Sequence, residues 1–293
     1  MELPRILIIG RNGQVGYELR RTLAPMASIV AVDYPDIDLT SADSIRKWVR
    51  ETKARVVINA AAYTAVDKAE AEIDRAMQIN GEAPGIIAEE AAKMGSLMVH
   101  YSTDYVFPGN KSTPYVETDE PGPLGAYGRT KLAGDLAVQA VGGAHLIFRL
   151  CWVYGSRGQN FMLTMMRLAR ERDALRVVGD QVGCPTWSRM IAEATAQSVR
   201  TTLSKVASPK DFSGVYHLSA GGRTSWHGFA QAIIDRIPPT EKKCQSVVPI
   251  TTAEYPTPAK RPAFSAMDCG KLERAFGIRL PDWQESLAQV LEP

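Results

Sequence analysis

The chain has 293 residues, of which 45% are hydrophobic and 23% charged, and its formal net charge at pH 7 is +2. This length can bury a sizeable core, and a charge so close to zero gives no reason to expect nucleic acid or an anionic membrane as a partner. No apolar run reaches the roughly 18 to 20 residues of a membrane-spanning helix, so no membrane partner is expected.

The N-terminal half alternates short apolar segments, typical of buried strands, with segments of helical spacing. Strands are predicted at residues 5–10, 28–33, 56–59 and 97–102, and helices at residues 14–23, 41–52 and 73–94. Short apolar strands separated by helices favour right-handed βαβ units and a parallel sheet covered on both faces. We therefore predict an α/β fold built on a Rossmann-type doubly wound parallel sheet.

A long loop follows at residues 103–126, rich in Pro, Gly and Asp and long enough to be functional. After it, the sequence predicts strands at residues 144–150 and 215–218, and helices at residues 128–141, 161–172, 188–203, 226–236 and 285–291. The proline-rich residues 255–262 can form neither a helix nor a central strand. We predict a dinucleotide-binding domain at residues 1–150 and a smaller α/β substrate-binding part at residues 151–293, interleaved with the first.

The chain start and the cysteines bear on the cellular compartment. The first five residues, Met-Glu-Leu-Pro-Arg, lead into a strand without a signal-peptide pattern, so we expect an unprocessed, cytoplasmic protein. The cysteines are widely spaced and form no C-x-x-C pair, which favours free thiols over a disulfide framework. The four histidines lack the spacing of metal ligands, so no catalytic metal is expected.

A glycine-rich turn, Gly10-Arg11-Asn12-Gly13-Gln14-Val15-Gly16, joins the first strand to the first helix. Glycine permits backbone conformations and close approaches that other residues forbid. The free N–H groups at the helix start can then hold a pyrophosphate. An ordinary tight turn is the alternative, but the strand-turn-helix context favours a dinucleotide site formed by Gly10, Gly13, Gln14, Val15 and Gly16.

Two side chains near this turn give opposite indications about the cofactor. Asp33 ends the second strand about 20 residues after the glycines, where an acidic residue usually binds the adenosine ribose and favours NAD. Arg11 could instead accept the 2′-phosphate of NADP. The choice between NADH and NADPH therefore stays open. Asp38 and Leu39 come next and could reach the adenine, with a plain loop role as the alternative.

Tyr127 and Lys131 are four residues apart, so their side chains share a face if the segment is helical. A free tyrosine, with a pKa of about 10, is a poor proton donor near neutral pH, and a neighbouring cation lowers that pKa. Hydride attack on a ketone builds negative charge on its oxygen, which Tyr127 would quench with its proton. The lysine could also bind the nicotinamide ribose. An isolated pair would be an ordinary surface feature, but the dinucleotide turn favours catalysis.

Ser102 and Thr103 end the fourth predicted strand, at the edge where open α/β sheets bind their ligands. A hydroxyl group at this edge can bind the substrate carbonyl and hold it next to the tyrosine. We assign this role to Thr103, with a helix cap or a turn hydroxyl as the alternative.

Together these motifs resemble those of the extended short-chain dehydrogenases/reductases, and more narrowly those of the dTDP-4-dehydrorhamnose reductases. Besides the glycine turn and the Tyr127–Lys131 pair, the resemblance rests on residues 59–70, 102–107, 148–149, 152–154, 160–161, 180–186, 216–218, 255–258 and 261–262. It covers nearly the whole chain, and its later motifs are specific to the narrower family. The resemblance implies reduction of the 4-keto group of dTDP-4-dehydro-β-L-rhamnose to dTDP-L-rhamnose, with NADPH or NADH as cofactor.

The resemblance also implies roles for individual residues. Thr103, Tyr127 and Lys131 would form the catalytic triad, and Asp104, Tyr105 and Trp152 would contact the sugar nucleotide. The cofactor would be lined by Gly13, Gln14, Val15, Ala61, Ala62, Tyr63 and Ser102. We add Asn160 and Arg261 as further candidates for substrate binding. A guanidinium group matches phosphate oxygens, so Arg261 could clamp the diphosphate, with a surface salt bridge as the alternative.

Some members of this family pair through a magnesium ion held by glutamates. Glu18 matches the first of these glutamates, but Arg189 stands where a second is expected. The expected state is therefore a monomer or a homodimer, and a metal-bridged dimer is disfavoured.

The same fold also hosts dehydratases, epimerases and binding proteins, so the fold does not decide the reaction. A 4,6-dehydratase needs a Thr-Asp-Glu set after the fourth strand, whereas Thr103-Asp104 is followed here by Tyr105, which cannot be the base. An epimerase would keep its nicotinamide bound, with no net redox change. The chain also resembles the non-catalytic, nicotinamide-binding β subunit of methionine adenosyltransferase, although the intact Thr103, Tyr127 and Lys131 favour an enzyme.

Overall fold

The computed structural model describes residues 3–204 and 208–292. Its main element is a six-stranded, fully parallel sheet in the order β10-β5-β4-β3-β1-β2. The strands are β1 (Arg5–Ile9), β2 (Ser28–Val32), β3 (Val56–Asn59), β4 (Leu97–Thr103), β5 (His145–Leu150) and β10 (Gly214–Leu218). Every residue of β3, β4 and β5 is buried, as a sheet covered on both faces requires. The predicted α/β, Rossmann-type fold is confirmed.

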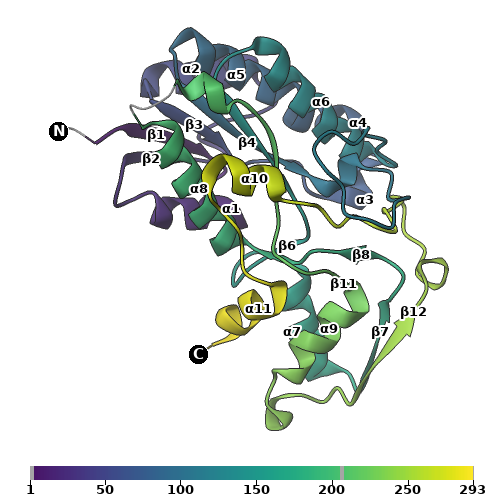
Figure 1. Cartoon of the computed structure of the whole chain (residues 1–293). Helices are drawn as coiled ribbons and strands as arrows, with labels where there is room; N and C mark the ends of the chain where they lie inside the picture. Colours follow the sequence, from purple (N-terminus) through teal and green to yellow (C-terminus); the bar gives the residue numbers. More distant parts are fainter. Residues whose placement is uncertain (1–2, 205–207, 293) are drawn as a thin grey trace.

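Helices cover both faces of this sheet (Figure 1). On one face α1 (Gln14–Thr22) and α8 (Ser188–Thr202) pack against each other, and on the other lie α2 (Ala42–Thr52), α5 (Ala83–Lys93) and α6 (Ala126–Val141). Each face has its own cluster of buried, mainly aliphatic side chains from the sheet and the helices. Helix α6 also buries Lys131 and Asp135. The sheet is therefore rigidly held, and its carboxyl edge is a stable platform for ligands.

The segment predicted as one helix at residues 73–94 is interrupted. It forms α4 (Ile73–Met77), a π-helical turn η1 (Gln78–Glu82) and then α5. The wide turn brings Asn80 against α6, where its amide group donates a hydrogen bond to the Thr130 hydroxyl (3.2 Å). This tertiary contact, which helical periodicity cannot reveal, accounts for the interruption.

The helix that carries the candidate proton donor begins earlier than predicted. The sequence predicts residues 128–141, whereas α6 begins at Ala126, after Gly125 in an extended N-cap conformation. The Ala126 N–H donates to Oε1 of Glu70 (2.7 Å), just beyond the short helix α3 (Val66–Ala69). A side chain distant in sequence therefore satisfies a free N–H of the first turn.

The second half of the chain builds a smaller lobe beside the carboxyl edge of the sheet (Figure 1). Its helices are α7 (Phe161–Glu171), α9 (Trp226–Asp235) and α11 (Trp283–Leu291), all near their predicted positions. Short strands were not predicted: β6 (Val153–Tyr154) pairs with β9 (Thr186–Trp187), β7 (Ala174–Val178) with β12 (Ser246–Ile250), and β8 (Val182–Gly183) with β11 (Thr224–Ser225). The remaining elements are α10 (Gly270–Phe276) and the 3₁₀ turns η2 (Asp104–Val106), η3 (Pro209–Phe212), η4 (Pro239–Glu241) and η5 (Thr252–Glu254).

The chain passes between the sheet and the lobe more than once. After α7 and β7 in the lobe, it returns to form α8 against α1 and then β10 at the edge of the sheet, beside β5. It then crosses to α9 and β12, and α10 comes back to pack on β10. The sheet domain thus contains segments from both sides of residue 150.

The described part of the chain has neither a membrane-spanning helix nor a cluster of metal ligands. Within residues 3–204 and 208–292, no helix combines the length and hydropathy needed to cross a bilayer. Over the same ranges, no three His, Cys, Asp or Glu side chains are grouped so that they could hold a metal ion. Cys151, Cys184, Cys244 and Cys269 are all free.

Candidate active site

A cavity of about 680 Å³ lies at the carboxyl ends of β1, β3, β4 and β5. The order of the sheet reverses between β1 and β3, and open α/β sheets bind ligands at such a switch point. The cavity brings together the predicted residues Gly10, Gly13, Gln14, Val15, Asp33, Ala61, Ala62, Ser102, Thr103, Asp104, Tyr105, Tyr127, Lys131 and Trp152. An adjoining cavity of about 620 Å³ is lined by Asp38 and Leu39, and shares Asp33 with the first.

The glycine turn is packed too tightly for a side chain at two of its positions. Gly10 has φ of +94°, and a Cβ atom there would lie 2.6 Å from the backbone nitrogen of Ala61. A Cβ atom on Gly16 would clash with the Gly10 carbonyl, so Gly16 shapes the turn without lining the cavity itself. The first turn of α1 keeps its free N–H groups directed at this cradle, which therefore fits the pyrophosphate of a dinucleotide.

We expect Gly10→Ala to weaken binding of reduced nicotinamide nucleotide by at least about tenfold, because its Cβ atom must displace the Ala61 backbone and its φ is strained. Fluorescence titration of the nucleotide measures this affinity. Gly95→Ala is the matched control, since Gly95 also has a positive φ (+66°) but has no atom within 4 Å of an added Cβ. Equal affinities of the Gly10→Ala variant and the unmodified protein would contradict the assignment of this cradle.

Asp33, which favours NAD, and Arg11, which favours NADP, are both held by hydrogen bonds near the end of β2. The Asp33 carboxylate accepts a hydrogen bond from the N–H of Asn12 in the glycine turn (2.9 Å). The Arg11 guanidinium binds the Asp36 carboxylate (2.9 Å) and the Ala31 carbonyl (2.9 Å). An acidic and a basic group thus flank the expected ribose position, and both NADH and NADPH remain compatible with it.

Tyr127 and Lys131 lie one turn apart on α6, and both line the cavity. Lys131 is only 1% exposed, and its Nζ atom donates a hydrogen bond to the Tyr101 carbonyl (2.6 Å). Burial lowers the pKa of Lys131 to about 8 and raises the pKa of Tyr127 to about 12. The expectation that the lysine lowers the tyrosine pKa is therefore corrected: Lys131 is directed at the backbone of β4, and desolvation dominates at the phenol.

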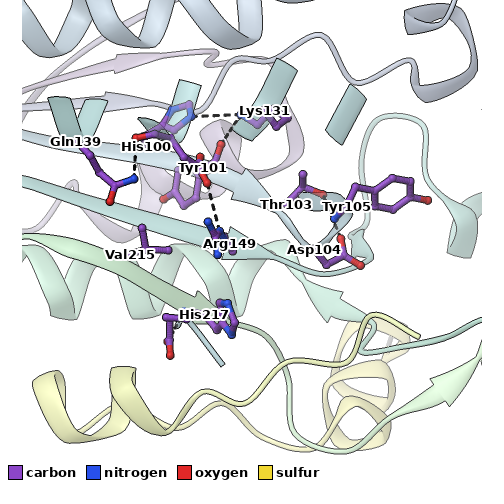
Figure 2. A network of polar contacts seen from close by, with 12 residues as sticks. His100, Tyr101, Thr103, Asp104, Tyr105, Lys131, Gln139, Arg149, Val215 and His217 are labelled. Carbon is purple, nitrogen blue, oxygen red and sulfur yellow. Dashed lines mark hydrogen bonds and ion pairs between the residues drawn. The ribbon is translucent and has the colours of Figure 1, made fainter. Parts of the chain in front are cut away.

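Thr103, Asp104 and Tyr105 follow one another at the end of β4 (Figure 2). The Thr103 hydroxyl accepts a hydrogen bond from the Tyr105 N–H (3.2 Å) and donates one to Oδ1 of Asp104 (3.1 Å). Burial raises the pKa of Asp104 to about 6, and it also raises the pKa of Tyr105 above its ordinary value. The Tyr105 ring meets the Tyr127 ring edge to face, with centroids 5.6 Å apart. A phenol that is so hard to deprotonate cannot serve as the base of a dehydratase.

Two stacked tryptophans form another wall of the cavity. Trp152 has φ of +44°, which is rare for a residue other than glycine and is found at functional sites. Its indole stacks on Trp226, with centroids 3.5 Å apart, and Nε1 of Trp226 donates to Oε1 of Gln181 (3.2 Å). This flat apolar surface suits the face of a sugar ring or a nucleobase.

Known proteins resemble this chain over nearly its whole length. The pattern of the RmlD substrate binding domain matches residues 4–293. The dTDP-4-dehydrorhamnose reductase of Burkholderia thailandensis is 48% identical over 284 residues, which cover 96% of this chain and 95% of that protein. The chain belongs to the dTDP-4-dehydrorhamnose reductase family.

Solved structures of this reductase family share the fold. The dTDP-4-dehydrorhamnose reductase of Clostridium acetobutylicum is 38% identical, with a TM-score of 0.90, and the match covers 98% of both chains. The Bacillus anthracis dTDP-4-dehydrorhamnose reductase, solved in complex with NADP, is 33% identical, with a TM-score of 0.90 over 99% of both chains. Because the matches cover nearly the whole of each chain, the likeness extends to the smaller lobe as well as the sheet.

Three predicted residues of this family member do not line the cavity themselves, although Asn160 donates a hydrogen bond to Gln14, which does. Asn160 caps the first turn of α7 with its Oδ1 atom, and its Nδ2 atom is also bound by the protein. The Tyr63 hydroxyl donates to Oε2 of Glu72 (2.9 Å). Arg261 forms an ion pair with Asp67 (2.9 Å). The structure thus gives Asn160 a capping role and Arg261 a salt bridge, and it does not place these three residues among those lining the cavity.

Further residues line the cavity without having been predicted. They are Asn12, Ala60, Thr64, Val66, Tyr101, Leu150, Val153, Gly158, Gln159 and Trp226. Several of them lie next to a predicted motif in the sequence, and this position could have been used to predict them. Trp226 carried no such signal, because in sequence it is only the first apolar residue of an amphipathic helix.

We expect Gly183→Ala to raise the KM for the keto-sugar of this family by at least about tenfold, with little change in cofactor affinity. A Cβ atom on Gly183 would clash with the Trp152 indole and push it off Trp226, whereas the glycine turn lies elsewhere in the cavity. Steady-state kinetics with varied substrate measure the effect. Gly221→Ala is the control in the same lobe, because its Cβ atom would meet neighbours at an ordinary 3.5 Å. An unchanged KM in the Gly183→Ala variant would contradict a role for Trp152 in binding.

Proposed function

We propose that this chain catalyses the NAD(P)H-dependent reduction of the 4-keto group of dTDP-4-dehydro-β-L-rhamnose, which yields dTDP-L-rhamnose. One observation carries the proposal: the Tyr127 phenol, the Thr103 hydroxyl and the Lys131 amine line the same cavity as the glycine turn. The substrate is taken from the names of the relatives. Those names give no support to an epimerase or to a regulatory subunit.

The residues divide the work of the reduction. A reduced nicotinamide, when bound, supplies the hydride that forms the new C–H bond at C4 of the sugar. When the substrate binds, the Thr103 hydroxyl turns its proton from Asp104 to the carbonyl oxygen and so orients the carbonyl. As negative charge develops on the carbonyl oxygen, Tyr127 transfers its proton to it and completes the hydroxyl group. Because burial raises the pKa of Tyr127 to about 12, the phenol is protonated throughout the neutral range.

The other cavity residues hold the two ligands. At the pyrophosphate we place Gly10, Gly13, Gln14 and Val15; at the adenosine Asp33, Asp38 and Leu39; and toward the nicotinamide Ala61, Ala62, Ser102 and Lys131. Asp104, Tyr105 and Trp152 are placed at the sugar nucleotide. This arrangement leaves the carbonyl between Thr103 and Tyr127, within reach of the hydride donor.

The activity is tested by mixing the protein with dTDP-4-dehydro-β-L-rhamnose and either NADPH or NADH. We expect a loss of the reduced-nicotinamide absorbance that requires the keto-sugar, a result that an epimerase or a regulatory subunit would not give. Running dTDP- and UDP-linked sugars side by side determines the nucleotide preference. The absence of oxidation with both cofactors would overturn the proposal.

We also propose a cytoplasmic enzyme that is a monomer or a homodimer without a metal bridge. Four free cysteines are typical of a reducing compartment. Arg189 lies 3.4 Å from Glu18 and 2.8 Å from Glu193, so a fixed cation already balances these carboxylates. Size-exclusion chromatography should give the same apparent mass with and without EDTA, and a mass that falls with EDTA would contradict the proposal.

A further inference from the structure

The Lys131 amine, at the wall of the cavity, lies among buried groups that the reaction above does not use (Figure 2). Besides its hydrogen bond to the Tyr101 carbonyl, its Nζ atom lies 3.4 Å from Nε2 of His100. His100 is 0% exposed, and its neighbour Asn59 is 1% exposed. Their hydrogen bonds to the protein therefore decide where their protons lie.

Asn59 fixes which nitrogen of His100 carries the proton. Oδ1 of Asn59 accepts a hydrogen bond from the Ala61 N–H (3.3 Å), so its NH₂ group faces Nδ1 of His100, 3.3 Å away. An amide NH₂ group only donates, and Nδ1 must therefore accept. Burial holds the pKa of His100 well below its ordinary value, so the ring is neutral and its single proton is on Nε2.

The Nε2–H group of His100 consequently points at Nζ of Lys131. A neutral amine has a lone pair that accepts this hydrogen bond, whereas an ammonium group has only donors and would face a further donor. We propose that His100, held by Asn59 in its Nε2–H tautomer, is a positioning residue that stabilises the neutral amine form of Lys131. This rests on the proposed function, in which Lys131 lies toward the nicotinamide, one helical turn from the proton donor Tyr127.

The proton that Tyr127 gives to the product has to be replaced before the next turnover. In this proposal the Lys131 ammonium supplies that proton to the Tyr127 phenolate, which breaks an N–H bond, forms an O–H bond and leaves a neutral amine. His100 then donates its hydrogen bond to the new lone pair. The amine later takes up a proton from solvent through the cavity that both residues line. His100 cannot pass the proton further, because its Nδ1 atom is occupied by Asn59 and its buried ring stays neutral. His100 thus changes the protonation equilibrium of Lys131 without relaying protons.

The titratable groups around Lys131 act in opposite directions. His100 of β4 favours the neutral amine, and burial also lowers the Lys131 pKa, to about 8. Asp135, one turn further along α6, favours the ammonium, although Arg149 of β5 pairs with it (3.2 Å). Tyr127, one turn earlier, is uncharged near neutral pH. Removing the contribution of His100 therefore leaves Asp135 to raise the Lys131 pKa.

The first test reads the tautomer in the unmodified protein. The ¹⁵N chemical shifts of the His100 ring distinguish a protonated nitrogen from an unprotonated one. We expect the proton on Nε2 over the whole range in which the protein is folded. A proton on Nδ1, or a charged ring, would overturn the proposal without any mutation.

The second test titrates Lys131 directly, by NMR of protein with isotopically labelled lysine side chains and without substrate. In His100→Gln, the amide can turn either a donor or an acceptor toward Nζ, so the pKa of Lys131 should rise by about one unit, comparable to the effect of one hydrogen bond. The pH at which kcat/KM changes should move by the same amount. A structural defect alone would lower activity without this shift.

Asn59→Leu removes the amide group that fixes the tautomer of His100, while both His100 and Lys131 stay in place. His100 can then turn an unprotonated Nε2 to Lys131, and the pKa of Lys131 should again rise. His227→Gln is the matched control, because His227 binds the Val247 carbonyl (3.1 Å) in the other lobe, and it should leave that pKa unchanged. An unchanged Lys131 pKa in the folded variants would refute the inference. An inactive protein whose Lys131 still titrates as expected would refute only the proposed function.

Discussion

Replacing Tyr127 by Phe should lower kcat by at least about 100-fold while leaving the affinity for the reduced cofactor nearly unchanged. The substitution removes only the hydroxyl group that donates the proton. The ring can keep its edge-to-face contact with Tyr105, so the wall of the cavity is retained. Steady-state kinetics with the keto-sugar and fluorescence titration of the cofactor separate the two quantities.

Tyr216→Phe is the control for this substitution. Tyr216 is another largely buried tyrosine, but its hydroxyl donates to the Phe212 carbonyl (2.7 Å), and it does not line the cavity. Its variant should retain the kcat of the unmodified protein. Full activity of the Tyr127→Phe variant would refute the role of Tyr127 as proton donor.

Arg149→Met should destabilise the fold by about 3 to 5 kcal/mol, the usual result of removing one partner of a buried ion pair. The Arg149 and Asp135 side chains are 5% and 0% exposed, and Nε of Arg149 lies 3.2 Å from Oδ2 of Asp135. Without Arg149, Lys131 is the remaining positive charge that acts on the Asp135 carboxylate among the residues that the structure describes. Urea-induced unfolding followed by circular dichroism measures the loss as a lower midpoint.

The double variant Arg149→Met, Asp135→Leu provides the matched comparison. Replacing both partners by apolar side chains of similar size removes the uncompensated charge, so most of the lost stability should return. This recovery distinguishes an electrostatic penalty from a packing defect. A single variant that unfolds at the same urea concentration as the unmodified protein would show that the pair is not needed for stability.

The elements of the main sheet could be predicted because their signals are local. After Arg5, β1 is a continuous apolar run that ends at the glycine turn, and β3 is apolar until Asn59. β7 and β12 could not be predicted, since each depends on a partner about 70 residues away in the chain. β12 also contains Pro249, which usually argues against a strand and is tolerated here in an isolated two-stranded sheet.

The chemistry of the site could be predicted only in part from the motifs. Spacing placed Tyr127 and Lys131 on one face of a helix, but it could not show that Lys131 binds the Tyr101 carbonyl. The direction of the Tyr127 pKa shift was predicted incorrectly, because the depth of burial is a tertiary property. Asn59 begins one of the quoted motifs and His100 lies two residues before another, and neither was given a role. Their contact joins β3 to β4 and appears only when the sheet is formed.

The late position of β10 in the sequence has a consequence for synthesis of the protein in the cell. A nascent chain emerges from the ribosome with its N-terminus first, so the first five strands of the sheet are available well before β10. Until β10 follows, β5 is an open edge with unpaired backbone groups, which favours association with other chains. The main sheet is thus completed only when residues 214–218 have been made, and until then the growing chain exposes the β5 edge to other chains.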